Sequence, residues 1–403
     1  MNTGYDVIVV GARCAGSPTA MLLARRGYRV LLADRASFPS DAVSTLIIHS
    51  PGIAALDRWG LLDDLAATGC PPVQRYIFDF GPLVIDGKPY PWDGTSVAYA
   101  PRRTILDKIL IDAADRAGAE VREGFTVENL LIEDGVVAGV RGHDTGGPSV
   151  TERAQVVIGA DGHNSRIARA AGAAPYHDKP VLERAYYTYW SGLPVDGFIT
   201  YIRGDRGIAA IPTNDELTLV LVGVPIAQAN DFKRNLEASY LAAIDREPEF
   251  AKKIRAATRV DRIVGEGVPN FFRKPFGPGW ALVGDAGYTK DPITAQGITD
   301  AFHTAERCAE ALDQALTGRR SYDEAMTDYQ HQRDTRALPI YEFTTQLATL
   351  DPPPPEMQQL FAAIAGNQAA MDAFVSVAAG TLSPTDFFAP ANLTSILTQS
   401  HVE

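Results

Sequence analysis

The N-terminal segment of the sequence has the pattern of a strand, a glycine-containing turn, a helix and a second strand. Tyr5–Val10 is a short apolar run followed by glycine, as in a buried parallel strand. The segment from Ala15 to Arg26 is rich in Ala, Leu, Met and Arg, which favour a helix. A second strand is predicted for Arg29–Ala33, directly before Asp34. Because a βαβ unit takes about 30 residues, this segment predicts the start of an α/β domain with a parallel sheet.

The turn matches the dinucleotide-binding fingerprint at two of its three glycine positions. Gly11 permits the tight turn and Gly16 lets the helix pack on the strand, but Arg13 stands where a second glycine would face the pyrophosphate. The Arg13 side chain must therefore point away from the phosphates or contact one. The amides at the helix start still face the pyrophosphate, and Asp34 lies where a carboxylate accepts both hydroxyls of the adenosine ribose. The alternative is an ordinary strand–turn–helix junction that uses glycine for packing. The candidate cofactor-binding residues of this segment are Gly11, Ala12, Arg13, Cys14, Ala15, Gly16, Asp34 and Arg35.

Two further glycine-containing motifs follow at large separations. One is Gly-Ala-Asp-Gly at 159–162, with Ser165 behind it. The other is Gly-Asp-Ala-Gly at 284–287, followed by Pro292 and by Gln-Gly at 296–297. Each motif is a weak signal alone. Together with the first turn, they describe one chain that encloses FAD along its length.

Composition limits the class of protein. A chain of 403 residues favours two domains over one. The net charge of −12 argues against nucleic-acid and anionic-membrane partners, because both need clustered Lys and Arg. No apolar run approaches the roughly 20 residues that span a bilayer, and the N-terminus lacks a signal-peptide pattern. Three widely spaced cysteines suggest reduced thiols. We therefore expect a cytoplasmic protein that acts on a small molecule, with no nucleic-acid, membrane or metal partner; a homodimer is compatible with the sequence.

The order of predicted elements indicates the domain organisation. β-branched and aromatic runs separated by Gly, Pro, Asn and Asp predict an antiparallel sheet between about residues 175 and 275. Helical composition dominates from about Thr294 onward. The predicted fold is α/β: a Rossmann-like FAD-binding domain, interrupted by an antiparallel-sheet substrate domain and followed by a helical C-terminal region. The predicted boundaries are 1–73, 98–174 and 276–320 for the FAD-binding domain, 74–97 and 175–275 for the substrate domain, and 321–403 for the helical region.

On these three motifs the sequence resembles the flavoprotein monooxygenases of the aromatic-hydroxylase type, within the glutathione-reductase-like FAD superfamily. It also resembles their geranylgeranyl-reductase and flavin-halogenase relatives. The resemblance covers roughly residues 5 to 310. It implies FAD as the cofactor, with NADPH or NADH as a transient reductant. In the family, the Asp-Gly motif matched by Asp161 and Gly162 lies where the FAD and nicotinamide sites meet. The arginine usual seven residues after the aspartate is Ala168 here.

The third motif carries the most detailed implication of the resemblance. Asp285 is expected to hydrogen-bond a ribityl hydroxyl, and Pro292 to border the isoalloxazine ring. The amides of Gly297 and Ile298 begin a helix whose dipole stabilises negative charge on the flavin. Tyr288 and Ala295 depart from the residues usual in the family. Arg103, or alternatively Arg102, is expected to reach the pyrophosphate or the flavin. The resemblance thus adds Ser44, Thr45, Arg103, Val127, Asp161, Gly162, Gly284, Asp285, Pro292, Gln296, Gly297 and Ile298 to the candidate cofactor-binding residues.

The resemblance implies a monooxygenase in which NAD(P)H reduces FAD, oxygen adds at flavin C4a, and the hydroperoxide hydroxylates a small apolar or aromatic substrate. An aromatic-rich sheet is expected to wall the substrate site, through Tyr187, Tyr189, Trp190 and Tyr201. No catalytic base is identified. His49, His163 and Tyr288 are candidates by residue type only.

Two alternatives remain open from the sequence. A flavin-dependent reductase of prenyl double bonds, or another FAD dehydrogenase, shares the same motifs. A non-catalytic protein that binds flavin and serves as an interaction module is the other alternative. The absence of a Trp-x-Trp-x-Ile-Pro segment disfavours a tryptophan-type halogenase.

Overall fold

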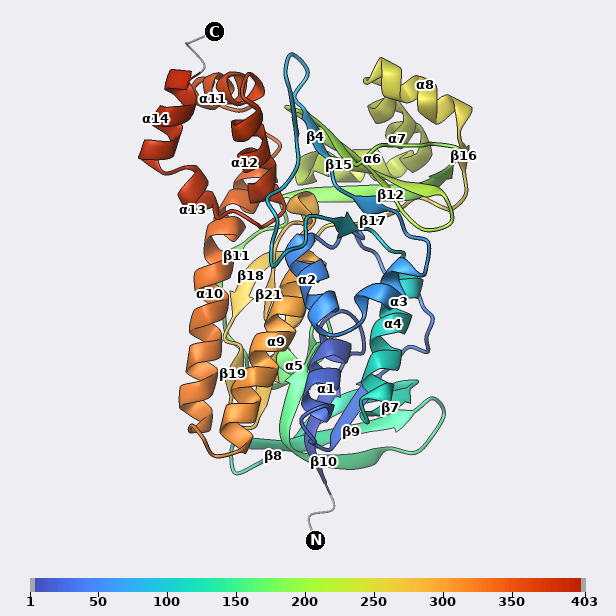
Figure 1. Ribbon diagram of the computed structural model, residues 1–403. Helices are drawn as coiled ribbons and strands as arrows, with labels where there is room; N and C mark the ends of the chain where they lie inside the picture. Colours follow the sequence, from blue (N-terminus) through green and yellow to red (C-terminus); the bar gives the residue numbers. More distant parts are fainter. Residues whose placement is uncertain (1–3, 400–403) are drawn as a thin grey trace.

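The computed structural model describes residues 4–399 and contains two large sheets joined by long helices (Figure 1). The first sheet consists of β1 (Tyr5–Val10), β2 (Val30–Asp34), β7 (Glu120–Glu123), β8 (Phe125–Glu133), β9 (Val136–Asp144), β10 (Val150–Gly159), β19 (Phe276–Gly277) and β20 (Trp280–Leu282). Its parallel core runs in the order β20, β10, β1, β2, β7. β19 and the β8–β9 hairpin add antiparallel pairs at its borders.

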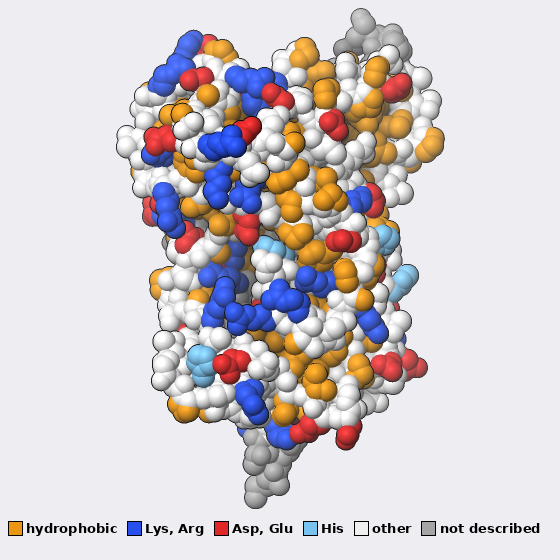
Figure 2. Space-filling model, turned by 180° about the vertical axis from the view of Figure 1, so that it is seen from behind, with side chains coloured by type: hydrophobic (Ala, Val, Ile, Leu, Met, Phe, Trp, Pro, Cys, Tyr) orange, Lys and Arg blue, Asp and Glu red, His pale blue; other side chains and the backbone are white. Residues whose placement is uncertain are grey.

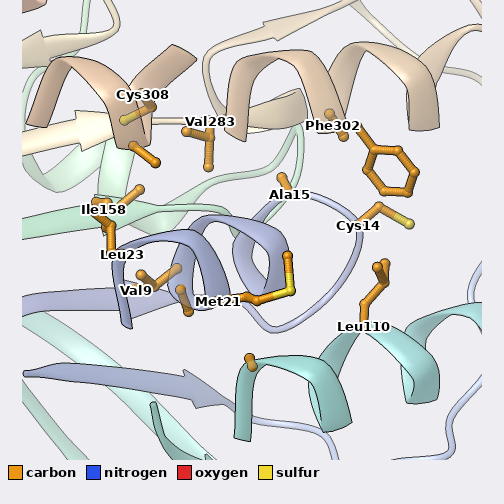
Figure 3. Packing of buried hydrophobic residues seen from close by; sticks show 14 of the residues in the cluster. Val9, Cys14, Ala15, Met21, Leu23, Leu110, Ile158, Val283, Phe302 and Cys308 are labelled. Atoms are coloured by element: carbon orange, nitrogen blue, oxygen red, sulfur yellow. The ribbon is translucent and has the colours of Figure 1, made fainter. Parts of the chain in front are cut away.

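Helices cover both faces of the first sheet. One face carries α1 (Gly16–Ala24), α4 (Arg103–Arg116) and α9 (Gly297–Leu316), and the other carries α5 (Arg166–Ala170). Apolar side chains of β1 and β10 pack against Met21 and Leu23 of α1 and Phe302 and Cys308 of α9 (Figure 3). Because this cluster joins the first βαβ unit to α9, nearly 300 residues later in the chain, it fixes the start of α9 beside the turn after β1.

The second sheet lies above the first in Figure 1. Its strands are β4 (Tyr76–Asp79), β5 (Val84–Gly87), β12 (Glu183–Ser191), β13 (Phe198–Arg203), β14 (Arg206–Pro212), β15 (Leu217–Pro225), β16 (Thr258–Arg259) and β17 (Val264–Glu266). The order is β16, β12, β15, β14, β13, β4, β5, and β17 also pairs with β12. β13 and β4 pair in parallel, so the sheet is not wholly antiparallel as predicted. The reason is that the β4–β5 hairpin enters from an earlier part of the chain.

Smaller elements complete the second sheet and its connections. One face of the sheet is covered by α6 (Ile226–Arg234), α7 (Leu236–Asp245) and α8 (Pro248–Ala256). Two small sheets, β11 (Pro175–Lys179) with β18 (Asn270–Arg273) and β21 (Tyr288–Thr289), and β3 (Pro72–Val73) with β6 (Ala98–Tyr99), lie where the chain passes between the two large sheets. The short helices α2 (Ser50–Arg58) and α3 (Leu62–Ala66) follow the first βαβ unit.

The C-terminal region is helical. The long helix α10 (Tyr322–Leu347) packs along α9 and leads to α11 (Pro355–Ala365), α12 (Gln368–Ala378), α13 (Pro384–Phe387) and α14 (Pro390–Gln399). Phe361 and Phe374 of this region share one buried cluster with Phe198 and Leu219 of the second sheet. Within residues 4–399, no single helix is long and apolar enough to cross a membrane; α11 and α12 pass only as a pair bent by 119°, on length and composition alone.

The predicted fold class is confirmed, with local differences. Between β15 and β16, Asn235 leaves the helical conformation and separates α6 from α7. The helix α8 was not predicted.

Candidate active site

A cavity of about 700 Å³, here called the first cavity, lies where the carboxyl ends of β1, β2 and β10 meet the starts of α1 and α9. In an open α/β sheet this edge is where ligands bind. All three sequence motifs reach it. The predicted residues that line it are Gly11, Arg13, Cys14, Ala15, Asp34, Arg35, Ser44, Thr45, Arg103, Val127, Asp161, Gly162, Gly284, Asp285, Pro292, Gly297 and Ile298.

Three predicted residues lie beside this wall instead of on it. The Ala12 side chain is buried in the hydrophobic core, although its amide bonds Asp34. Gly16 packs beneath the turn, where an added Cβ would lie 1.8 Å from the Gly11 carbonyl oxygen. Gln296 turns toward the C-terminal region, and its Nε2 donates to the Ala378 carbonyl over 2.9 Å. Ala12, Gly16 and Gln296 therefore do not line the first cavity.

The glycine turn after β1 is held by close backbone contacts. Gly11 has a φ of 104°, and a Cβ there would lie 2.4 Å from the Ala160 carbonyl oxygen. Gly284 likewise has a positive φ, and its added Cβ would meet the Ala15 Cβ at 2.6 Å. A side chain at either glycine would collide with a neighbouring motif, so only glycine lets the three motifs approach this closely around the cavity. Close packing is the role expected of glycine in the fingerprint.

Arg13 lines the first cavity and has protein partners of its own. Its guanidinium extends away from the turn, donating to Oδ2 of Asp107 over 2.5 Å and to Oγ of Ser40 over 2.9 Å. The same Asp107 accepts from Arg103 over 2.9 Å and from the Cys14 thiol over 3.4 Å. Burial raises the pKa of the Cys14 thiol, which therefore stays protonated as a hydrogen-bond donor.

Asp107 was missed by sequence reasoning. It is fully buried and lies between two arginines, Arg13 and Arg103. The only signal for it is its position four residues after Arg103 on one helix. Of the two candidate arginines, Arg103 lines the cavity. Arg102 instead lies over the Tyr189 ring, 4.8 Å from its centroid.

Asp161 lines the first cavity and also holds the start of a helix. Its Oδ1 accepts from the Ser165 hydroxyl over 2.5 Å, and its Oδ2 accepts from the Arg166 amide over 2.7 Å. Ser165 in turn caps α5 by accepting from the Ala168 amide. The first amides of a helix have no partner within the helix itself. Asp161 and Ser165 supply those partners for α5, so the Asp-Gly motif fixes the start of this helix against the cavity.

Asp285 faces the first cavity from the turn after β20. It lies deep in the protein yet remains solvent-accessible, because the cavity opens over it. The surrounding protein desolvates the carboxyl and raises its pKa, while His163 and Arg103 act in the opposite direction. A carboxyl in such a site is suited to accept a hydrogen bond from a ligand hydroxyl.

The residues of the first cavity fit FAD. An added Cβ at Gly297 or Gly162 would meet nothing within 4 Å, so the backbone there borders open space. Asp34 and Asp285 supply acceptors for hydroxyl groups, and the starts of α1 and α9 offer amides to anionic groups. Arg35 and Arg103 add positive charge along the wall. Although the chain is acidic, Lys and Arg side chains gather across the middle of the face seen in Figure 2.

A second cavity of about 1110 Å³ adjoins the first, and Thr45 and Pro292 line both. Its walls are mainly apolar. One wall is the face of the second sheet, through Phe198, Ala209, Ile211, Leu219 and Leu221; the other is the C-terminal region, through Phe343, Met357, Phe361, Phe374 and Phe388.

The predicted aromatic wall is mostly wrong. Tyr201 borders the second cavity, but its ring packs 5.2 Å from that of Phe250 on the helix-covered face. Tyr187, Tyr189 and Trp190 do not line the cavity. Trp190 packs with Tyr240 on the helix-covered face of the sheet. Tyr187 instead accepts from the Ser44 amide over 3.2 Å. Strand periodicity predicts that side chains alternate between faces, but not which face borders a cavity.

The three catalytic candidates chosen by type differ in their placement. His49 is buried between the Tyr76 hydroxyl, at 2.7 Å, and the Thr294 carbonyl, at 3.2 Å. Burial lowers the pKa of His49 to about 4, so its ring stays neutral, and it lines neither cavity. His163 also lines neither cavity and lies 3.5 Å from Glu266. Tyr288 does line the first cavity, and its buried hydroxyl has no hydrogen-bond partner among residues 4–399.

Comparisons with known proteins agree with this architecture. A family profile described as FAD binding domain matches residues 4–344. A digeranylgeranylglycerophospholipid reductase of Methanosarcina acetivorans is 28% identical over 333 residues, which cover 79% of this chain and 77% of the relative. A tryptophan 2-halogenase of Chondromyces crocatus is 26% identical over 345 residues, which cover 82% of this chain and 65% of the relative.

Solved structures share the fold. The myxobacterial chondrochloren halogenase CndH superposes with a TM-score of 0.79 at 24% identity, covering 98% of this chain and 96% of that chain. The flavin-dependent brominase Bmp2 gives a TM-score of 0.82 at 18% identity, covering 99% of both chains. PqsL of Pseudomonas aeruginosa, described as a probable FAD-dependent monooxygenase, gives 0.73 at 20% identity, covering 94% of this chain and 100% of that chain.

Proposed function

The chain belongs to the FAD binding domain family and is an FAD-dependent oxidoreductase, and from this premise we propose that it is a monooxygenase that uses NAD(P)H and O2 to hydroxylate a small apolar or aromatic substrate. The non-catalytic alternative is set aside, because the reductase, the halogenases and the probable monooxygenase reported above are enzymes. The observation that carries the proposal is the second cavity, which is large, apolar and joined to the first cavity at Thr45 and Pro292. A substrate held there would lie beside the flavin end of the cofactor.

The chain's own residues would bind and orient the cofactor. Asp34 would hold the adenosine ribose, and Asp285 would accept from the ribityl chain. The amides of Gly297 and Ile298, at the N-terminus of the 20-residue helix α9, would stabilise negative charge on the flavin. Bound FAD would supply the electron transfer and oxygen activation, while the protein supplies orientation and electrostatics.

Water exclusion is the second contribution of the chain. The C-terminal region closes one side of the second cavity, with Phe361 and Phe374 in its wall. Apolar walls on both sides favour an apolar substrate through the hydrophobic effect. A dry pocket also protects reactive intermediates from side reactions with water.

Reduction of a prenyl double bond is the second candidate. Digeranylgeranylglycerophospholipid reductases are among the relatives at 28% identity, and a cavity of about 1110 Å³ could hold a long apolar chain. Both candidates place an apolar group at the same junction of the two cavities. They differ in their need for oxygen.

The test is substrate-stimulated oxidation of NADPH and NADH by the FAD-loaded enzyme, with and without oxygen, over a panel of aromatic and prenyl compounds. The proposal expects oxidation that requires oxygen and yields a hydroxylated aromatic product. Anaerobic turnover with a prenyl compound would favour the reductase instead. A purified protein that carries no FAD and takes none up would contradict both candidates.

A further inference from the structure

Two buried carboxyl groups meet in the wall that separates the two cavities. Glu183, the first residue of β12, lines the second cavity, and Asp291, just before Pro292, lines the first. Their side chains hydrogen-bond each other, and only 2% and 1% of the two residues is exposed. Sequence reasoning passed over both residues, because neither belongs to a motif and they are far apart in the chain.

The surroundings of Asp291 leave one oxygen for this contact. Its Oδ1 accepts from the Ile293 amide over 3.1 Å, and its own amide donates to Asn270 over 2.7 Å. Oδ2 is buried, and besides the Ile293 amide the groups that act on this carboxyl are the side chain and the backbone amide of Glu183. A hydrogen bond between two carboxyl groups requires that one of them carry a proton.

Burial decides how the pair ionises. Burial and the neighbouring Asp291 raise the pKa of Glu183 well above its ordinary value. Burial also raises the pKa of Asp291, to about 7, although the hydrogen bond from Glu183 acts in the opposite direction. The two groups titrate as a coupled pair. Near neutral pH the pair therefore keeps one proton and exchanges the second, and Asp291 is the member that borders the first cavity.

Cations near the pair are engaged elsewhere. Lys290 pairs with Asp300, and Lys179 pairs with Glu342 over 2.5 Å. His49 faces the same loop through the Thr294 carbonyl and stays neutral. A buried carboxyl pair without a cation costs stability, so packing alone does not account for it. Its position between cofactor and substrate cavities gives a chemical reason.

We propose that Asp291, held by a protonated Glu183, delivers the proton that the reaction consumes at the junction of the two cavities. The inference rests on the proposed function. Hydroxylation converts a C–H bond, O2, NAD(P)H and one proton into a C–OH bond, NAD(P)+ and water. In each turnover the Asp291 O–H bond breaks, the proton enters the water that forms, and the carboxylate takes a proton from solvent. Reduction of a C=C bond by NAD(P)H also consumes one proton, which would then form a C–H bond.

The test compares Asp291→Asn, Glu183→Gln and Glu183→Leu in the FAD-loaded enzyme, with Glu237→Gln as a matched control. Glu237 lies on α7, on the outside of the second sheet, and pairs with Arg259 over 3.0 Å. Three quantities are measured against pH: the infrared band of protonated carboxylic acids, the FAD midpoint potential and kcat. The first two need no substrate.

The wild type should show a carboxylic acid band that titrates near pH 7 and a midpoint potential whose pH slope changes there. Asp291→Asn should abolish both features and lower kcat by about 100-fold, the usual scale for a lost general acid, with KM for NAD(P)H within about twofold. Glu183→Leu removes the donor that stabilises the Asp291 carboxylate, so the fall of kcat at high pH should move to higher pH. Glu183→Gln keeps a donor and should restore the wild-type profile.

An Asp291→Asn enzyme with an unchanged pH slope of the midpoint potential, or with wild-type kcat, would overturn the inference. If no compound stimulates NAD(P)H oxidation by the wild type, the proposed function fails. In that case the infrared band and the pH dependence of the FAD midpoint potential still show whether Asp291 gains and loses a proton near the flavin.

Discussion

The Ala12 amide donates a hydrogen bond to Oδ2 of Asp34 over 2.7 Å and so ties the turn after β1 to the end of β2. The other oxygen of the same carboxylate accepts from the Ala36 amide over 2.8 Å. Both oxygens are thereby fixed at the rim of the first cavity, and each keeps a lone pair. The carboxylate is in place before a ligand arrives.

Replacing Asp34 by alanine should weaken FAD binding, because two ribose acceptors are lost. Hydrogen bonds to a charged group contribute about 1.5–3 kcal/mol, so we expect the Kd for FAD to rise by about tenfold or more. Fluorescence titration of the FAD-free protein measures this. Asp57→Asn, on an exposed position of α2, is the control and should leave the Kd unchanged. Equal affinities of Asp34→Ala and wild type would contradict the placement of the ribose.

Two glycines offer a matched test of space for the cofactor. At Gly297 an added Cβ meets nothing within 4 Å, whereas at Gly16 it would lie 1.8 Å from the Gly11 carbonyl oxygen. Gly297→Val should leave the thermal stability of the FAD-free protein within about 1 °C and reduce FAD retention at least tenfold, because its side chain enters the cavity. Gly16→Val should instead lower the free energy of unfolding by more than about 2 kcal/mol, through backbone strain and overpacking. The opposite ranking in a melting experiment would show that the space at Gly297 is not where FAD lies.

Asp107 should be required for stability as well as for the site. Its removal leaves two arginines without their shared carboxylate, and breaking a buried ion pair costs about 3–5 kcal/mol. We expect Asp107→Asn to lower the unfolding free energy on this scale and to weaken FAD binding, because Arg103 loses its orientation. Asp112→Asn on the same helix breaks only the half-exposed pair with Lys108, and should cost less than about 1 kcal/mol. Denaturant unfolding compares the two variants.

The raised pKa of Asp291 predicts a pH dependence of stability. The folded protein binds the proton more tightly than the unfolded chain, whose Asp titrates near 3.8. The stabilising contribution of the protonated form is therefore complete below about pH 4 and is lost as the pH rises through about 7. Asp291→Asn removes this titration, so its melting temperature should exceed that of the wild type by about 2 °C or more at pH 8 and by less at pH 5. A difference that does not change with pH would contradict the placement of the proton.

The second cavity can be filled without touching the first. Ala209, on β14, faces the second cavity and is only half-buried. Ala209→Trp should retain FAD with its normal spectrum but lose substrate-stimulated NAD(P)H oxidation. Thr218→Val, a buried position on β15 that lines neither cavity, provides the comparison. Unchanged stimulation in Ala209→Trp would place the substrate elsewhere.

Local sequence patterns were sufficient for the first βαβ unit, where strand β1 has the predicted bounds and the helix boundaries shift by one or two residues. Apolar periodicity and glycine positions are local properties, so these elements and the three motifs could be found in one sequence. Contacts between distant segments could not. Asp107 meets Arg13 across 94 positions, and Glu183 meets Asp291 only because two sheets are brought together.

Side-chain direction was the other property that the sequence did not determine. Arg13 occupies a glycine position of the fingerprint, and only the placement of Asp107 and Ser40 makes clear that it extends away from the turn. Gln296 adjoins Gly297 but faces α12 instead of the first cavity. Asp161 caps α5, because two helix amides lie within its reach. The direction of each of these side chains depends on which neighbouring residue offers it a hydrogen-bond partner.

The family profile ends at residue 344, whereas Phe361, Phe374 and Phe388 beyond it form one wall of the second cavity. If the second cavity binds the substrate, as proposed, its binding surface is encoded partly outside the stretch that matches the FAD binding domain profile. Mutations in the 59 residues after position 344 would then alter ligand choice without disturbing electron chemistry. Over evolutionary time such a division lets one ancestral scaffold diversify in what it accepts, and it makes tail exchange between homologues a practical route to new specificities.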